Sequence, residues 1–341
     1  MKKISTLTVA CALAFFSKAG VLTVNNNSNS PGQYTSLQTA IDSASAGDSI
    51  YVHGSATSYS NVSIKKQLTL LGTGHNPNKT NNLISEIGII LLDTINGISG
   101  ASGTKIIGFK LNRVSGFGGS GGTKNIFVSR NYFISGGSKI IITGKGWTIE
   151  NNIINSSSVT VSNNSNVIIR NNIFNNASIV TSNQPSVLIA NNIFFGTSPL
   201  TCFTTLSNAL IANNIFSGSS PKGANVNTNT FNNNITYQTA YDTIPFGTNS
   251  GSGNILAQNP LYTNVASTSF SYSYDFSLQA TSPGKNAGTD GTDLGIYGGA
   301  MPFVDMTGSP AIPQMKLVSI LNPMIPAGDS LHVIIKAKKQ N

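Results

Sequence analysis

The sequence predicts an all-β solenoid in which each coil of about 20 to 22 residues contributes three short strands. Three observations lead to this prediction: a motif recurs at a nearly constant spacing, polar and apolar residues alternate within it, and the composition favours turns and strands. Of the 341 residues only 9% are charged and 39% are hydrophobic, while 34 are Gly. Such a composition disfavours long helices.

The repeat is clearest in five segments of the middle of the chain. In order, they read NIFVSRNYF, GWTIENNII, NVIIRNNIF, SVLIANNIF and NALIANNIF, and they end at Phe133, Ile154, Phe174, Phe194 and Phe216. A related segment ending at Leu111 extends the series backward, and a degraded one at 232–236 extends it forward. Repetition at one period is typical of a solenoid.

Each unit has room for three short strands but not for a helix. In one unit, residues 167–169 alternate, 173–174 are apolar and 178–181 alternate again. An Asn follows the first strand, where a corner requires a residue that tolerates left-handed backbone angles. Its amide could also bond to the Asn of the next coil, about 4.8 Å away. We therefore expect an asparagine ladder formed by Asn131, Asn151, Asn171, Asn191 and Asn213.

The two ends of the solenoid are expected to carry extra elements. Residues 36–45 place Leu37, Ala40 and Ile41 on one helical face, which predicts a short helix that caps the first coil. The β-helix should span 20–300. Beyond it, residues 301–341 read as a linker and a C-terminal β-hairpin cap or appendage, with strands at 315–320 and 331–338.

The Asn-cornered repeat resembles the right-handed parallel β-helix of the pectate-lyase superfamily over roughly residues 21–300. Two segments resemble the opening and the closing parts of secreted Bacteroidetes β-helix proteins: LQTAIDSASAGDSIYV near the start and DFSLQATSPGKNAGTDGTDLGIYGG near the end. The resemblance implies a protein whose ligand is a polysaccharide, held along one exposed sheet.

The first residues read as a targeting segment. Lys2 and Lys3 precede an apolar run, and small residues then flank Lys18, which predicts a signal peptide at 1–19 cleaved near Ala19. We expect a secreted or outer-surface protein without a transmembrane segment, since no apolar run is long enough to cross a bilayer. Cys202 would be the one cysteine left, so no disulfide is expected within the chain.

Catalytic chemistry has few candidates in this sequence. A glycosidase needs facing carboxylates, yet Glu150 is the one acidic residue within the regular repeat. A lyase needs a base and a cation that neutralises the uronate carboxylate. Glu86 and Asp93 could hold calcium for it, with Lys110 or Arg113 as the base. The alternative is that these are ordinary turn and loop charges.

Three charged residues precede the corner in consecutive units, namely Arg130, Glu150 and Arg170. We expect their side chains to stack in successive coils, with positive, negative and positive charges in that order. They form either an arginine pair that grips an acidic sugar or an exposed salt-bridge ladder, and the ladder is favoured because Glu150 would compete for both guanidinium groups.

The resemblance to the pectate-lyase superfamily implies that the third strand of each unit presents the ligand-facing surface. Alternation assigns Thr160, Ser162, Val180, Ser182, Thr201 and Phe203 to outward positions, with Lys139 at the edge. This face offers hydroxyls and apolar groups, and Lys139 joins Arg130 and Arg170 as a candidate for glycan binding.

Two functional hypotheses follow. The first is non-catalytic binding of polysaccharide, a cell-surface glycan or another surface. The second is a calcium-assisted polysaccharide lyase that acts on an acidic glycan; no other cofactor is expected. Nucleic acid is not an expected partner, because the net charge of +9 comes from scattered Lys residues and three separate Arg residues. We expect a monomer.

Overall fold

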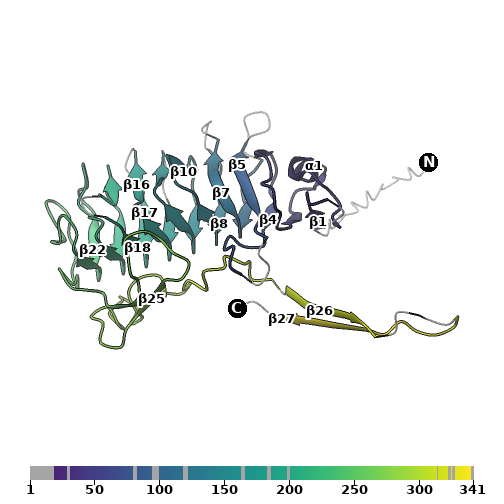
Figure 1. The fold of residues 1–341 in the computed structure, drawn as a ribbon. Coiled ribbons are helices and arrows are strands. Elements are labelled where there is room, and N and C mark those ends of the chain that lie inside the picture. The colour runs from purple at the N-terminus through teal and green to yellow at the C-terminus, as the bar shows by residue number, and fades with distance from the viewer. Residues whose placement is uncertain are drawn as a thin grey trace, which may run out of the picture.

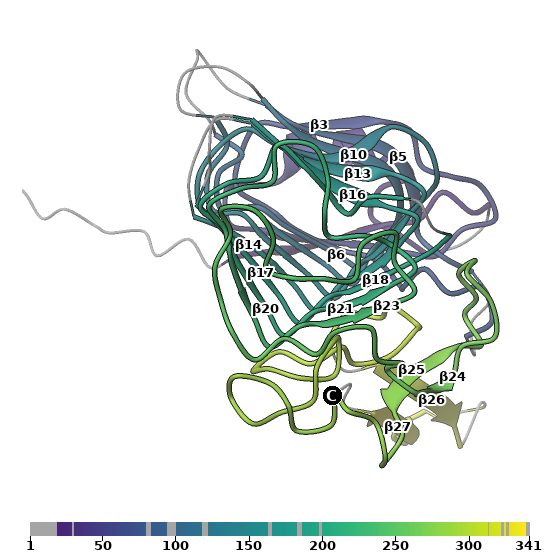
Figure 2. The same ribbon diagram turned by 90° about the vertical axis from the view of Figure 1, so that its left-hand side faces the viewer.

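The computed structural model describes residues 19–28, 31–79, 83–93, 100–117, 122–162, 166–182, 186–197, 200–312, 314–321, 324 and 327–338. Almost all of the predicted signal peptide therefore lies outside the described residues. The chain winds into a parallel β-solenoid, seen from the side in Figure 1 and along its axis in Figure 2. The expected fold class is confirmed.

One side of the solenoid is a ten-stranded parallel sheet. Its strands, in spatial order, are β1 (Val21–Val24), β2 (Ser49–Val52), β4 (Thr69–Leu71), β6 (Lys105–Ile107), β8 (Phe127–Ser129), β11 (Thr148–Glu150), β14 (Val167–Arg170), β17 (Val187–Ala190), β20 (Leu210–Ala212) and β22 (Thr230–Asn232).

A 13-stranded sheet forms the other two sides. We call its first part arm 1: β3 (Val62–Ile64), β5 (Glu86–Leu92), β7 (Lys110–Gly116), β10 (Ser138–Ile142), β13 (Ser158–Val161), β16 (Ser178–Thr181) and β19 (Phe203–Thr204). Arm 2 is β9 (Tyr132–Phe133), β12 (Ile153–Asn155), β15 (Ile173–Asn175), β18 (Ile193–Phe195), β21 (Ile215–Ser217) and β23 (Ile235–Tyr237). Strand β7 joins the arms, because its first residues pair with β9 and later ones with β10.

The core consists of identical or similar side chains stacked from coil to coil. Ile169 pairs with Ile189 in the neighbouring strand, and both are fully buried. The ring of Phe194 lies 4.5 Å from that of Phe174 and 5.2 Å from that of Phe216, measured between centroids, and both pairs are stacked. The recurring Phe of the repeat is thus a core residue.

The asparagine ladder exists, but it lies one residue later than predicted at all positions except Asn131. Its members are Asn131, Asn152, Asn172, Asn192, Asn214, Asn234 and Asn254. In each step the side-chain oxygen accepts from the backbone N–H and the amide of the Asn one coil before; for Asn172 and Asn152 these distances are 2.9 and 3.0 Å. These bonds satisfy polar groups that the corner would otherwise bury unpaired.

The predicted residues Asn151, Asn171, Asn191 and Asn213 have left-handed backbones, with φ between 52° and 59°. This part of the prediction was right. The left-handed residue turns the chain, so its side chain leaves the interior and the following side chain enters it. Arg130 is the left-handed residue of its own coil, with φ of 56°. That is why Asn131 belongs to the ladder and the other four predicted residues do not.

After β23 the chain turns back along the solenoid. Residues 256–312, the return segment, run along the outside of arm 2 toward the N-terminal coils and include the antiparallel pair β24 (Tyr262–Asn264) and β25 (Asp275–Leu278) (Figures 1 and 2). Its apolar side chains cover outward-facing isoleucines of arm 2. This second core contains Ile153, Ile173, Ile193, Phe195, Ile215, Ile235, Phe276, Leu278, Leu294, Ile296 and Phe303. Arm 2 is therefore buried on both faces, as its consecutive Ile-Phe residues indicate.

The left-handed corner residues hold the return segment. The amide of Asn171 donates to the carbonyl oxygens of Ile296 and Gly298, both at 2.9 Å. Equivalent bonds join Asn151 to Met301, Asn213 to Thr289, Asn233 to Ala287 and Arg130 to Ser309. The two adjacent Asn residues of a corner thus have different roles: the first binds the return segment and the second forms the ladder.

The predicted extra elements are present at both ends. Helix α1 (Leu37–Ser43) buries Leu37, Ala40 and Ile41, and the Ser36 hydroxyl caps its first turn. At the other end, β26 (Gln314–Ile320) and β27 (Val333–Lys338) form an antiparallel hairpin. Figure 1 shows the hairpin projecting away from the solenoid, so it is an appendage and does not cover the last coil.

Replacing Asn172 with Ala should lower the free energy of unfolding by about 3 kcal/mol, because the backbone N–H and the amide of Asn152 lose a buried acceptor. Asn171→Ala is the matched control: it removes both bonds to the return segment and should leave the coils paired. Denaturant unfolding measures the first effect and limited proteolysis of the return segment the second. Equal global destabilisation by both changes would contradict the two separate roles.

His75 lies under the return segment and is almost fully buried. Its Nδ1 is 3.1 Å from the hydroxyl of Tyr272, and its ring stacks on that of Tyr272 and approaches that of Tyr132. Nε2 has no hydrogen-bond partner among the described residues. Burial, and to a smaller extent the charge of Lys79, lower the pKa of His75 from 6.5 to about 3.

Stability should therefore depend on pH in a defined window. The unfolded chain binds a proton at His75 below pH 6.5 and the folded chain does not, so this contribution is complete above pH 6.5 and is lost as the pH falls toward about 3. The loss is on the order of 5 kcal/mol over the whole window. Measuring the unfolding free energy of the wild type and of His75→Gln at several pH values isolates the contribution of His75. Parallel pH profiles for the two proteins would contradict the assignment.

Candidate functional site

Several of the predicted charged residues do come together on arm 1. Lys110 and Arg113 lie on β7, between β5 and β10, and Lys139 lies near the start of β10. Lys139 is an extra residue in its strand, because the pairing of β10 with β13 shifts register between Ser138 and Ile140. The Lys139 side chain reaches Asn112 on the neighbouring strand β7, and the residue is only 5% exposed.

Arg113 and Lys139 form what we call the cation pair. The Lys139 Nζ lies 2.6 Å from the side-chain oxygen of Asn112, and the Arg113 Nε donates to the carbonyl oxygen of Ser138 at 3.1 Å. In the described part of the chain, no carboxylate lies within ion-pair distance of either cation. Burial, together with the charge of Arg113, lowers the pKa of Lys139. An anion placed here would relieve this repulsion.

Glu86 and Asp93 do not lie together as a shared calcium site would require. Glu86 and Asp93 lie at opposite ends of β5, about 23 Å apart for an extended strand. Glu86 makes an ion pair with Lys110 at 2.9 Å, and Asp93 lies 3.8 Å from Lys65. Among the described residues, no three His, Cys, Asp or Glu side chains are grouped so that they could hold a metal ion.

Hydroxyl groups continue the surface of arm 1 beyond the cation pair. Ser138, Ser158 and Ser178 lie in register on successive strands. A second row contains Thr160, Val180 and Thr204. The hydroxyls of Ser158 and Thr160 both donate to that of Ser138, at 3.2 and 2.9 Å. We call these two rows the hydroxyl face.

One residue of the predicted outward set is misplaced. Phe203 is fully buried and packs edge-on against Phe194. It pairs with the inward-facing Ile179, whereas Thr204 pairs with Val180. The longer connection between β18 and β19 shifts the alternation by one residue, which periodicity alone does not reveal.

The predicted stack of Arg130, Glu150 and Arg170 is only a pair. Glu150 aligns with Arg170 on one side but with Ser129 on the other. Arg130, one residue later, donates from its guanidinium to Ser309 at 2.8 Å. Arg170 lies 2.7 Å from the carboxylate of Glu150, which is buried and not exposed as expected. Arg130 lies outside the stack because it is the left-handed corner residue of its own coil, whereas Glu150 and Arg170 precede the left-handed residues of theirs.

Arg170→Ala should reduce stability by about 2 kcal/mol, because it leaves the Glu150 carboxylate buried without its cation. The double variant Arg170→Ala/Glu150→Gln should recover part of this loss, since the amide needs no counter-charge. Thermal unfolding of the two variants measures both effects. A stable Arg170→Ala protein that binds glycan less well would instead favour a role in glycan binding.

Sequence reasoning missed Asn112, which orients Lys139. The adjacent polar residues Asn112 and Arg113, which are both partly exposed, interrupt the alternation of β7 and were the available signal. No helix in the described residues is long and apolar enough to cross a membrane.

The chain was compared with protein-family models, curated protein sequences and solved structures. No protein-family model matches the chain, and no curated protein sequence matches it significantly. Among solved structures, the deglycosylated pectin methylesterase from Aspergillus niger is similar, with 16% identity over 70% of this chain and 87% of that chain and a TM-score of 0.29. The same enzyme in a penultimately deglycosylated form is 14% identical over 70% of this chain and 86% of that chain, with a TM-score of 0.29.

Proposed function

We propose that this protein is a secreted or cell-surface β-helix that binds polysaccharide without transforming it, and that an acidic group of the glycan binds at the cation pair. The observation that carries this proposal is the position of Arg113 and Lys139, two adjacent cations at one end of the hydroxyl face. Guanidinium and ammonium groups bind carboxylate and sulfate through charge-assisted hydrogen bonds.

The shape of arm 1 suits an extended polymer. Its seven strands span roughly 30 Å along the solenoid axis. The rows of Ser and Thr repeat at the spacing of the strands, so successive sugar hydroxyls would meet similar donors and acceptors. Val180 and Ile141 lie among them and offer apolar contact to the faces of sugar rings.

The carboxylates near this surface support binding over catalysis, because each has a structural partner. Glu86 pairs with Lys110, and Asp93 lies beside Lys65. A general acid or base would have to break one of these contacts before it could exchange a proton with a substrate.

The double variant Arg113→Ala/Lys139→Met should weaken binding to an acidic polysaccharide at least tenfold, and the wild-type affinity should fall with added salt. Methionine keeps most of the volume of the buried lysine stem. Lys105→Ala, which removes an exposed cation from the ten-stranded sheet, is the control and should change little. Affinity electrophoresis in gels that contain polygalacturonate, alginate or a sulfated glycan measures the effect. Equal retardation of both proteins would refute the role of the cation pair.

The second candidate is the calcium-assisted lyase. It is favoured by one observation, the presence of Arg113 as a possible base beside Lys139 on the same surface. A lyase would release unsaturated uronates, which absorb in the ultraviolet, when supplied with an acidic glycan and calcium. Binding of these glycans without any such product would decide for the first proposal.

A further inference from the structure

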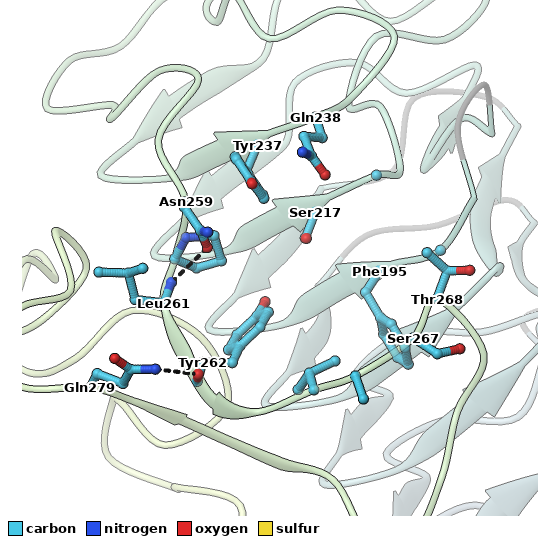
Figure 3. Close-up of a pocket in the computed structure, with 15 residues that line it drawn as sticks. Phe195, Ser217, Tyr237, Gln238, Asn259, Leu261, Tyr262, Ser267, Thr268 and Gln279 are labelled. Carbon is cyan, nitrogen blue, oxygen red and sulfur yellow. Dashed lines mark hydrogen bonds between the residues drawn. The ribbon is translucent and has the colours of Figure 1, made fainter.

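A cleft of about 380 Å³ lies at the far end of the solenoid from the cation pair, between arm 2 and the return segment (Figure 3). Its floor is made by the last residues of three successive strands, Phe195 of β18, Ser217 of β21 and Tyr237 of β23. An aromatic ring, a hydroxyl and a second aromatic ring therefore follow one another at the spacing of the strands, about 4.8 Å.

The opposite wall consists of residues 259–262 and 265–268 and of Gln279. Asn175, one coil before the floor, fixes this wall: its amide donates to the carbonyl oxygen of Thr268 at 2.7 Å, and its side-chain oxygen accepts from the N–H of Phe270 at 3.0 Å. Gln279 donates to the carbonyl oxygen of Tyr262 at 2.9 Å. The Asn175 contacts thus bind the wall to the solenoid, and the Gln279 contact braces the wall internally.

The lining is polar but carries no acidic or basic side chain among the described residues. It offers three amides, from Gln238, Asn259 and Gln279, and the hydroxyls of Ser217, Ser267 and Thr268. The phenols of Tyr237 and Tyr262 complete it, and burial raises the pKa of Tyr262, so that ring is neutral. Amides and hydroxyls both donate and accept, and they match a ligand that is rich in hydroxyl groups and uncharged.

Gln238 holds a position that makes its side chain notable. It has a left-handed backbone, with φ of 51°, as do Ser156, Asn176 and Gly218 at the equivalent corner positions of earlier coils. Asn and Gly tolerate that conformation better than Gln and Ser do. Figure 3 shows the Gln238 amide beside Tyr237 and Ser217, at the same hollow that Asn259 and Tyr262 face from the wall. The left-handed backbone thus places the Gln238 amide at the cleft.

We propose that this cleft binds an uncharged sugar residue, with the ring packed on Tyr237 and its hydroxyl groups bonded to the amides of Gln238, Asn259 and Gln279. The choice of a sugar as the ligand rests on the polysaccharide binding proposed above. The place and the neutrality come from the cleft itself, which lies apart from the cation pair. The protein would then have two glycan contacts of opposite character, one for an acidic group and one for a neutral unit.

The test is calorimetric titration of the full chain with a panel of neutral oligosaccharides, namely those of cellulose, xylan, mannan and galactan, and with oligogalacturonate as the acidic probe. At least one neutral oligosaccharide should bind. Tyr237→Ala should weaken that binding at least tenfold, because it removes the ring of the floor. Tyr274→Ala, a tyrosine outside the cleft lining, is the matched control and should bind as the wild type does.

Gln238→Gly separates binding from folding. Glycine accepts the left-handed backbone at lower cost, so the melting temperature should stay the same or rise, while neutral-sugar binding should weaken severalfold. This variant remains informative if Tyr237→Ala does not fold. Absence of binding by every neutral oligosaccharide, or binding that neither cleft variant changes, would overturn the proposal.

The cation-pair variant distinguishes the two glycan contacts. Arg113→Ala/Lys139→Met should bind the neutral oligosaccharide with unchanged affinity, and loss of that binding would also overturn the cleft assignment. If neither the wild type nor any variant binds acidic glycans while the neutral oligosaccharide still binds in the cleft, the proposal for the cation pair is wrong and the proposal for the cleft is supported.

Discussion

The corner of each coil is the constraint on which the rest of this structure depends. A left-handed residue reverses the chain between two sides of the solenoid, and the next residue must then bury a polar side chain in the core. Asparagine meets both demands, because it tolerates the left-handed backbone and can bond to its equivalent in the next coil. The column of ladder residues fixes the register of every strand on either side of it.

The same corner decides which surfaces remain exposed. Because the first residue of each corner points outward, it forms a row of amides that binds the return segment. The return segment then covers arm 2 with a second apolar core, and arm 1 is left as the long polar surface of the solenoid. Both proposed glycan contacts follow from this arrangement: the cation pair lies on uncovered arm 1, and the cleft lies where the cover leaves a hollow.

The cation pair and the cleft differ in how they could be found. Arg113 and Lys139 are charged residues in a chain with few charges, and either one is a visible candidate. Their proximity depends on an extra residue in β10, which turns Lys139 toward Asn112. The cleft unites strand ends near Phe195 and Tyr237 with Gln279, and no local pattern links residues so distant in the chain.

The sequence by itself determined the solenoid, its coil length, its three strands per coil, the capping helix and the left-handed corners, because these depend on short-range periodicity and on the backbone preferences of Asn. Only the tertiary structure decided which Asn enters the ladder, since one residue of register exchanges inside and outside. It also removed Arg130 from the stack with Glu150. These outcomes depend on strand register and on contacts with the return segment, which involve residues more than a hundred positions apart.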